Sequence, residues 1–373
     1  MQSDYFFCPR VSCPAHTLNL PNRSWCYRHG YHLTKAFGRV QRYRCRHCGK
    51  TFSDQTFLLN YWLKKPTDFH SLGRDINSSA SSNFVARHHH LSADSMRIRH
   101  DRLARNALYL QSLLTEHLQI IEPLVADGLE SYVDSQYFPV NLNILIGSIS
   151  QFVYFFTESH SRRKGTTTEK QKQRMREIYA DKSFAGSRIS TMLRTLLEYT
   201  IGRCPTKELT LRTDEHPVYE QVIKRWNGSE RRGLKIKHEV TASTEPRTMS
   251  NPLFAANYFD RLIRKDLPNH RRETVCQARN DRNLLSRFVY YVVTHNFYKP
   301  YRISSKAKQR RATHAGCIIE GTEGEREWKS RMHTYRFFRS FVQLPKYYEA
   351  VWFRRTATPL KREADPVPRF AYQ

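Results

Sequence analysis

The chain has 373 residues, of which 62 are Lys or Arg and 34 are Asp or Glu, so its formal net charge is +28. With 39% hydrophobic and 26% charged residues, this surplus is spread over folded units and favours a polyanionic partner, above all nucleic acid. The sequence has no run of 18 apolar residues and no N-terminal signal pattern, which argues against a membrane protein. We therefore expect a cytoplasmic protein of two or three folded units.

Four cysteines dominate the first 60 residues, which have too few apolar runs to form a core unaided. Cys8 and Cys13 form one pair, Cys45 and Cys48 a second, in the pattern C-x4-C-x31-C-x2-C. Two thiolates on each of two turns can supply the four soft ligands of a tetrahedral Zn²⁺. Residues 1–60 are therefore predicted to be a zinc-ribbon module with a structural ion, although Cys26 and His29 offer a competing pair.

Residues 61–115 have a helical pattern. A short helix around 84–86, a turn at Leu91 and a longer helix capped by Ser92 are expected, with Met96, Leu103, Ala107, Leu110 and Leu114 on one side of the longer helix. Arginines occupy its other faces, which is typical of a helix-turn-helix that enters a DNA groove. The predicted DNA contacts are Ser95, Arg97, Arg99 and Arg102; the alternative is a helical connector with solvated charges.

A mixed sheet flanked by helices is predicted for residues 116–302. Three strand candidates lie within 120–159, a polar loop and a helix near 188–200 follow, and further strands are expected at 208–213 and 234–240. Helices are expected at 217–226, 251–265 and 273–296. This order of elements is the one used by ribonuclease H-like folds, and it predicts an α/β domain with five strands.

Two acids occupy notable positions in that order. Asp127 lies within the first strand and Asp214 at the end of the fourth, and these strands are neighbours in a ribonuclease H-like sheet. Adjacent carboxylates repel unless a cation lies between them. Mg²⁺ or Mn²⁺ would remove the repulsion and could promote displacement at phosphorus. The alternative is that Asp127 stabilises a turn and Asp214 a helix N-terminus.

Taken together, several segments resemble bacterial insertion-sequence transposases over about residues 6–302. These segments are GYHLTKAFGRVQRYRCRHCGKTFSDQTF, ADGLESYVDSQYFPVNLNILIGSIS, SRRKG, LRTDEHPVYEQVI, HEVTASTEPRTMSNPLFAANYFDRLIRKDL and HRRETV. The resemblance implies a zinc-binding module and helix-turn-helix joined to a ribonuclease H-like domain with a catalytic acid triad. It also implies metal-dependent cleavage and strand transfer at the terminal inverted repeats of a mobile element.

By this resemblance, Asp127 and Asp214 are the first two acids of the triad. Glu273 is the preferred third acid, and Asn257 and Asp260 are the alternatives. Glu273 lies 59 residues beyond Asp214 (273 minus 214), farther than such enzymes usually place it.

The remaining expectations concern partners. Arg162, Arg163 and Lys164 are predicted to contact DNA phosphates, with an exposed charged loop as the alternative. The family implies double-stranded DNA as partner, a homodimer or larger assembly, and a location in the bacterial cytoplasm at the nucleoid. Residues 303–373 match nothing in the resemblance and are expected to form a helical appendage. Two other functions stay open: an inactive DNA-binding regulator derived from a transposase, and a structure-selective nuclease.

Overall fold

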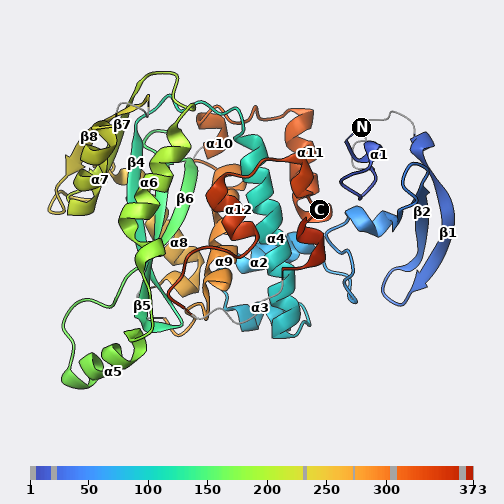
Figure 1. Ribbon diagram of the computed structural model, residues 1–373, viewed down its shortest axis with the longest axis horizontal. Coiled ribbons are helices and arrows are strands. Elements are labelled where there is room, and N and C mark those ends of the chain that lie inside the picture. Colours follow the sequence, from blue (N-terminus) through green and yellow to red (C-terminus); the bar gives the residue numbers. More distant parts are fainter. Residues whose placement is uncertain are drawn as a thin grey trace.

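The computed structural model describes residues 6–17, 23–229, 233–271, 274–302, 309–360 and 367–372. A small N-terminal sheet lies at one end of the molecule, helices fill the middle, and a larger sheet lies at the other end (Figure 1). Among the described residues, none of the helices combines the length and apolarity that a membrane span requires.

Three antiparallel strands in the order β1-β2-β3 form the N-terminal sheet. They are β1 (Cys26–Thr34), β2 (Gly38–Cys45) and β3 (Thr51–Ser53), accompanied by the short helices α1 (Pro14–Thr17) and η2 (Asp54–Phe57). Aromatic rings make up most of its core, which includes Phe7, Trp25, Phe52 and Phe57. We call residues 6–57 the N-terminal module.

A residue from the far end of the chain completes this core. Phe338 is 1% exposed, and its ring centroid lies 4.8 Å from that of Phe7 and 5.9 Å from that of Phe57. The backbone joins the same segments, because the Arg336 N–H donates to the Phe57 carbonyl at 2.9 Å. The N-terminal module and the C-terminal segment therefore fold as one packed unit.

The central helix of the molecule is α4 (Ala93–Leu114), capped by the Ser92 hydroxyl, which accepts from the Ser95 N–H at 3.2 Å. The helices α2 (Phe69–Ile76) and α3 (Ser82–His88) pack against it, as do α9 (Asp281–Val293), α11 (Glu323–Thr334) and α12 (Lys346–Trp352) from later in the chain. The predicted apolar side of α4 is confirmed, since Met96, Leu103, Ala107 and Leu110 are buried.

The large sheet has five strands in the order β6-β5-β4-β7-β8, which confirms the mixed sheet expected from the sequence. Its strands are β4 (Leu124–Val133), β5 (Ser135–Gly147), β6 (Val153–His160), β7 (Glu208–Asp214) and β8 (Lys235–Thr241). β4, β5 and β6 form an antiparallel meander, whereas β4, β7 and β8 pair in parallel. Apolar residues run through β4, β5 and β6 because both faces are covered, and all of β6 is buried.

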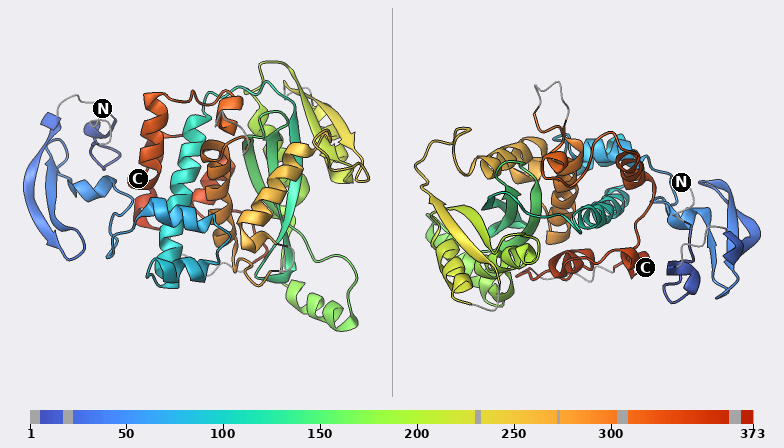
Figure 2. Two further views of the ribbon diagram at one scale, coloured as in Figure 1. Left: turned by 180° about the vertical axis from the view of Figure 1, so that it is seen from behind. Right: turned by 90° about the horizontal axis from the view of Figure 1, so that it is seen from above.

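Helices cover both faces of this sheet (Figures 1 and 2). α6 (Ile189–Thr200) and α7 (Pro217–Asn227) lie on one face, and α8 (Phe254–Asp266) lies across β4 and β5 on the other. The next helix, α9 (Asp281–Val293), continues into the π-helical turn η6 (Thr294–Tyr298) and packs against α4. The sheet and the central helices thus share one hydrophobic core.

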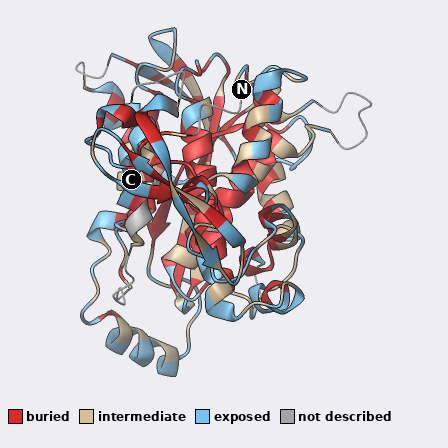
Figure 3. Ribbon diagram, turned by 90° about the vertical axis from the view of Figure 1, so that its right-hand side faces the viewer, coloured by how far each residue is buried: buried red, intermediate tan, exposed pale blue. Residues whose placement is uncertain are grey.

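One helix was not expected. α5 (Glu169–Tyr179) begins within the segment predicted to be a polar loop, and it stands away from the body with mostly exposed or half-buried residues (Figures 1 and 3). Thr168 accepts from the Gln171 N–H at 3.3 Å, and the Gln171 side chain accepts from the Thr168 N–H at 3.0 Å. Such a capping box is a sequence signal for the start of a helix, but the basic, polar composition of the segment favoured a loop.

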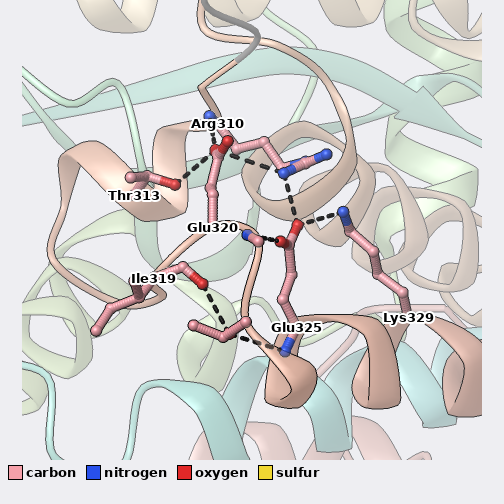
Figure 4. Close-up of polar contacts among 8 residues, drawn as sticks. Arg310, Thr313, Ile319, Glu320, Glu325 and Lys329 are labelled. Atoms are coloured by element: carbon pink, nitrogen blue, oxygen red, sulfur yellow. Dashed lines mark hydrogen bonds and ion pairs between the residues drawn. The ribbon is translucent and has the colours of Figure 1, made fainter.

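The C-terminal segment is helical, as expected, with α10 (Arg311–His314), α11 (Glu323–Thr334) and α12 (Lys346–Trp352). Glu325 at the start of α11 is 6% exposed; its carboxylate accepts from Arg310 at 2.6 Å and also pairs with Lys329 (Figure 4). Glu320 accepts from the Arg310 backbone N–H at 2.6 Å and from the Thr313 hydroxyl at 2.7 Å. These contacts fix the turn between α10 and α11, so that α11 lies against α4.

Candidate functional site

Two aspartates meet on neighbouring strands of the large sheet. β4 and β7 pair in parallel, with Leu124 opposite Leu211 and Val125 opposite Arg212. The recorded pairs end there; two residues further, the same register would set Asp127 opposite Asp214 on one face of the sheet. The two carboxylates are near enough for the charge of Asp214 to raise the pKa of Asp127.

A third carboxylate approaches from α8. Asp260 lies next to Phe259 and one turn before Ile263, which are fully buried and help to hold the helix against β4 and β5. One oxygen of Asp260, Oδ1, is buried and has no hydrogen-bond partner among the described residues. A buried acceptor without a donor is costly, so this oxygen has capacity for a ligand.

Charge interactions link Asp127 to each of the other two acids. Burial raises the pKa of Asp127, the Gly128 N–H opposes the rise, and the charge of Asp214 adds to it. Burial also raises the pKa of Asp260 well above its usual range, and the charge of Asp127 adds to this rise. Carboxylates that disfavour one another's ionisation are the arrangement that a multivalent cation relieves. We call Asp127, Asp214 and Asp260 the acid cluster.

Two residues that the sequence did not single out belong to this site. Burial raises the pKa of Tyr219, and the charges of Asp127, Asp214 and Asp260 raise it further. Arg247 is exposed, and its charge lowers the pKa of both Asp127 and Asp260. A basic residue at this edge fits a phosphate-bearing substrate. The sequence offers one hint for Tyr219, which lies two residues after Pro217 at the start of α7, and none for Arg247.

The other two candidates for the third acid are Glu273 and Asn257. Glu273 lies outside the described residues. Asn257 lies one turn before Asp260 on α8 and is half-buried. Among the described candidates, Asp260 has a charge interaction with Asp127.

The acid cluster has the donor set that Mg²⁺ and Mn²⁺ prefer, namely oxygens from several carboxylates. Its ligand atoms are less tightly gathered than those of the compact groups, in which all ligand atoms lie within 4.8 Å of one another among the described residues.

The four predicted zinc ligands come together in the N-terminal module. The sulfur atoms of Cys8 and Cys48 lie 3.4 Å apart, those of Cys13 and Cys45 lie 3.7 Å apart, and all four gather within 4.8 Å of one another. Zn–S bonds of about 2.3 Å in a tetrahedron require sulfur separations of about 3.8 Å. The site is therefore compatible with zinc, and Cys26 and His29 are not part of it.

Backbone geometry explains why these cysteines converge. Gly49 has φ of +68°, a left-handed conformation that glycine adopts freely, and its N–H donates to the Cys45 carbonyl at 3.0 Å. On the other side, the Cys13 N–H donates to the Arg10 carbonyl at 3.0 Å, and the Cys8 N–H donates to the Ala15 carbonyl at 3.0 Å. Each cysteine pair thus lies in a tight turn.

Two of the arginines expected to face DNA from α4 are buried instead. Arg99 and Arg102 are buried, at 4% and 6% exposure. Arg99 donates to the Thr67 hydroxyl at 2.6 Å, and Arg102 donates to the Leu59 carbonyl at 2.7 Å. Neither guanidinium is available to DNA in this fold, because α4 has helices packed around it rather than one open face.

The other two DNA-contact candidates on α4 stay accessible. Arg97 is exposed and pairs with Asp94 at 3.0 Å, and Ser95 is half-buried at the start of the helix. A salt bridge at this exposure contributes little, so Arg97 can exchange it for another anion.

The basic loop after β6 holds the remaining predicted DNA contacts. Arg162 and Lys164 are exposed, and Arg163 is half-buried. The Arg162 guanidinium lies 5.5 Å from the ring centroids of Tyr179 and Phe184, and that of Arg163 lies 5.6 Å from the ring of Tyr137. Aromatic contacts therefore position two of the three cations.

A large cavity lies between α4, α5, α9 and the C-terminal segment. Its volume is about 1260 Å³, and basic side chains outnumber acidic ones in its lining. The basic residues are Arg97, Arg105, Arg174, Lys182, Arg279, Arg282 and Arg354, and the acidic ones are Asp101, Asp134 and Asp281. We call it the basic cavity; its charge suits an anionic ligand.

Neither a family model nor a curated protein matches the chain.

Proposed function

We propose that the chain is a DNA transposase of the acid-triad type. Its ribonuclease H-like domain would cleave and join phosphodiester bonds with Mg²⁺ or Mn²⁺ held by Asp127, Asp214 and Asp260. The observation that supports this most is that the charge of Asp214 on β7 raises the pKa of Asp127 on β4, and the charge of Asp127 raises that of Asp260 on α8. The strand order β6-β5-β4-β7-β8 supports it too, because it makes the first and fourth strands of the sheet neighbours.

Bound divalent ions would activate the attacking oxygen and stabilise the leaving oxygen of an in-line displacement at phosphorus. The acids would have to lose their protons to hold these ions, and the raised pKa of Asp260 marks it as the one that benefits most from a cation. Tyr219 keeps its proton at neutral pH and can donate a hydrogen bond inside the cluster. Arg247 is exposed at the same edge, where it can contact a phosphate.

The rest of the chain would hold the DNA. The Cys8, Cys13, Cys45 and Cys48 site would bind a structural Zn²⁺, since four protein ligands leave no open position. The basic cavity and the loop cations Arg162 and Lys164 would contact the DNA backbone through charge, independent of its sequence.

The experiment uses a plasmid that carries the gene with its native flanking DNA. Purified protein and Mg²⁺ should cut at the flanks and give joined strand-transfer products, and Asp214→Ala should abolish cutting while binding to the flanking DNA persists. Cutting without joined products would replace this proposal by a nuclease. Binding without any cutting, in folded and metal-supplied protein, would replace it by a regulator. Equal loss of binding and cutting in Asp214→Ala would give Asp214 a structural role.

A further inference from the structure

One of the five tryptophans of the chain differs from the others because its indole faces solvent. Trp62 is 76% exposed, and its ring centroid lies 5.4 Å from that of Tyr61. The other four are at most 7% exposed, namely Trp25, Trp226, Trp328 and Trp352. A single exposed apolar side chain is common by itself, so the backbone and the charges around Trp62 decide what it means.

The backbone of Trp62 is strained. Its φ is +58°, in the left-handed region that glycine adopts freely and that is unfavourable for a bulky residue. Such a conformation persists only where surrounding contacts impose it, and it is typical of residues kept for binding. Neither burial nor backbone preference therefore explains why position 62 holds a tryptophan.

Residues 58–66, which we call the Trp62 loop, are held in place by two buried arginines of α4. Arg102 donates to the Leu59 carbonyl at 2.7 Å, before the tryptophan, and Arg99 donates to the Lys65 carbonyl at 3.1 Å, after it. Hydrogen bonds from charged donors are stronger than those from neutral ones. Both ends of the Trp62 loop are thus fixed to the central helix.

Further hydrogen bonds restrain the same backbone. The Asn60 side chain closes the loop, because its amide group donates to the Thr67 carbonyl at 3.1 Å and its oxygen accepts from the Thr67 N–H at 2.9 Å. The Leu59 N–H donates to the Thr334 carbonyl, at the end of α11, at 2.9 Å. A restrained loop loses little conformational entropy when a ligand stacks on its side chain.

The charge around the Trp62 loop favours an anionic partner. Lys64 and Lys65 are exposed within it, and the N-terminal module before it, residues 6–57, contains nine Lys or Arg residues against one acidic residue, Asp54. An aromatic face beside cations is the combination that holds an unpaired nucleobase and its phosphate. A fully paired duplex presents base edges in its grooves, so it has no base face to offer the indole.

We propose that Trp62 is a stacking site for an unpaired nucleobase of DNA, with Lys64 and Lys65 beside the adjoining phosphates. The inference rests on the proposed function for DNA as the partner, and its test does not depend on cleavage. It also gives Arg99 and Arg102 a role, since they hold the loop that carries the stacking side chain.

Acrylamide quenching of tryptophan fluorescence tests the proposal, because it reports mainly on Trp62 while the other four indoles are buried. The full chain, without Mg²⁺ or Mn²⁺, is titrated with three probes labelled for fluorescence anisotropy. They are a single-stranded oligothymidylate of about 12 nucleotides, its fully paired duplex, and that duplex with one additional unpaired thymine. The single strand and the duplex with the unpaired thymine should protect Trp62 from acrylamide, whereas the fully paired duplex should bind without protecting it.

Variants separate stacking from folding. Trp62→Leu should weaken binding of the oligothymidylate about 5- to 150-fold, the contribution of one base–aromatic stack, and Trp62→Phe, which keeps a ring, should lose less. Trp62→Gly should bind as weakly as Trp62→Leu yet unfold at no lower urea concentration than the wild type, because glycine relieves the positive φ. Lys64→Ala should reduce the slope of log affinity against log salt by about 0.7.

An indole that stays accessible to acrylamide while the single strand is bound would overturn this inference and leave the proposed function intact. Failure to bind the single strand, equal protection by the fully paired duplex, or wild-type affinity in Trp62→Leu would overturn it too. So would a loss of stability in Trp62→Gly, since the ring would then belong to the fold. Protection of Trp62 in a chain that never cuts DNA would support the stacking site and count against the transposase alone.

Discussion

Replacing Phe338 by Ala tests whether the C-terminal segment holds the N-terminal module. Phe338 is 1% exposed, and its ring packs against those of Phe7 and Phe57 with centroid separations of 4.8 and 5.9 Å. Removing a buried Phe side chain costs about 3–5 kcal/mol. If this free energy is lost from the contact between the N-terminal module and the C-terminal segment, the state in which the module is undocked becomes at least about 100-fold more populated. The factor follows because about 1.4 kcal/mol corresponds to tenfold.

Native-state hydrogen exchange measures this opening strand by strand. The amides of β2 and β3 should exchange at least about 100-fold faster in Phe338→Ala, whereas those of β4 and β5 should keep their protection. Phe341→Ala is the matched control, since Phe341 is 44% exposed although its ring lies 4.7 Å from that of Phe7. Its effect should be about 1 kcal/mol. Unchanged exchange in β2 and β3, or equal acceleration in both sheets, would refute the docking argument.

Three further predictions concern charge and metal. In EDTA, Asp260→Asn should stabilise the protein, and the gain should grow as the pH rises, because a raised folded-state pKa means that ionisation of Asp260 disfavours folding. Mg²⁺ at about 100 times its dissociation constant should instead stabilise the wild type by about 2.7 kcal/mol. Thermal unfolding measures both effects. For Glu325, burial raises the pKa, but Lys329, the Gly321 N–H and Arg310 outweigh it and lower the pKa overall. Glu325→Gln should therefore cost about 1–3 kcal/mol in urea unfolding at pH 7, and the difference should vanish as the pH falls through the folded-state pKa; an equal cost at pH 3 would contradict this. Cys48→Ser should release the zinc of the N-terminal module and increase proteolysis there, whereas Cys276→Ser, outside the cluster, should do neither.

The sequence predicted the large sheet well because β4, β5 and β6 contain apolar runs, and β7 alternates buried and less buried residues. The expectation that Asp127 and Asp214 lie on neighbouring strands came from the order of strands in ribonuclease H-like folds, and β4 and β7 do pair in parallel. The cysteine cluster could be predicted because two closely spaced cysteine pairs indicate a metal site without any knowledge of the rest of the fold.

What the sequence could not supply were contacts between distant segments. Arg99 and Arg102 resemble solvent-facing charges along α4, and only the packing of helices from the rest of the chain buries them. Phe338 lies far from the N-terminal module in sequence, so no local pattern connects them.

The preference for Glu273 as third acid stays a prediction, because Glu273 lies outside the described residues. The helix expected at 273–296 begins later, as α9 at Asp281. Asp260 was the weaker candidate from sequence, and its charge interaction with Asp127 depends on how α8 crosses the sheet. The angle of a helix over a sheet depends on packing that a linear pattern does not show.

The central claim is that Asp260 completes the metal-binding acids, and cleavage of flanking DNA by Asp260→Asn and Glu273→Gln tests it most directly. We predict that Asp260→Asn loses more than about 100-fold of the Mg²⁺-dependent cleavage rate while still binding DNA, because altering even a residue that only supports metal ligands costs 10- to 100-fold. Glu273→Gln should cleave at close to the wild-type rate. Full activity in Asp260→Asn, with activity lost in Glu273→Gln, would contradict the account.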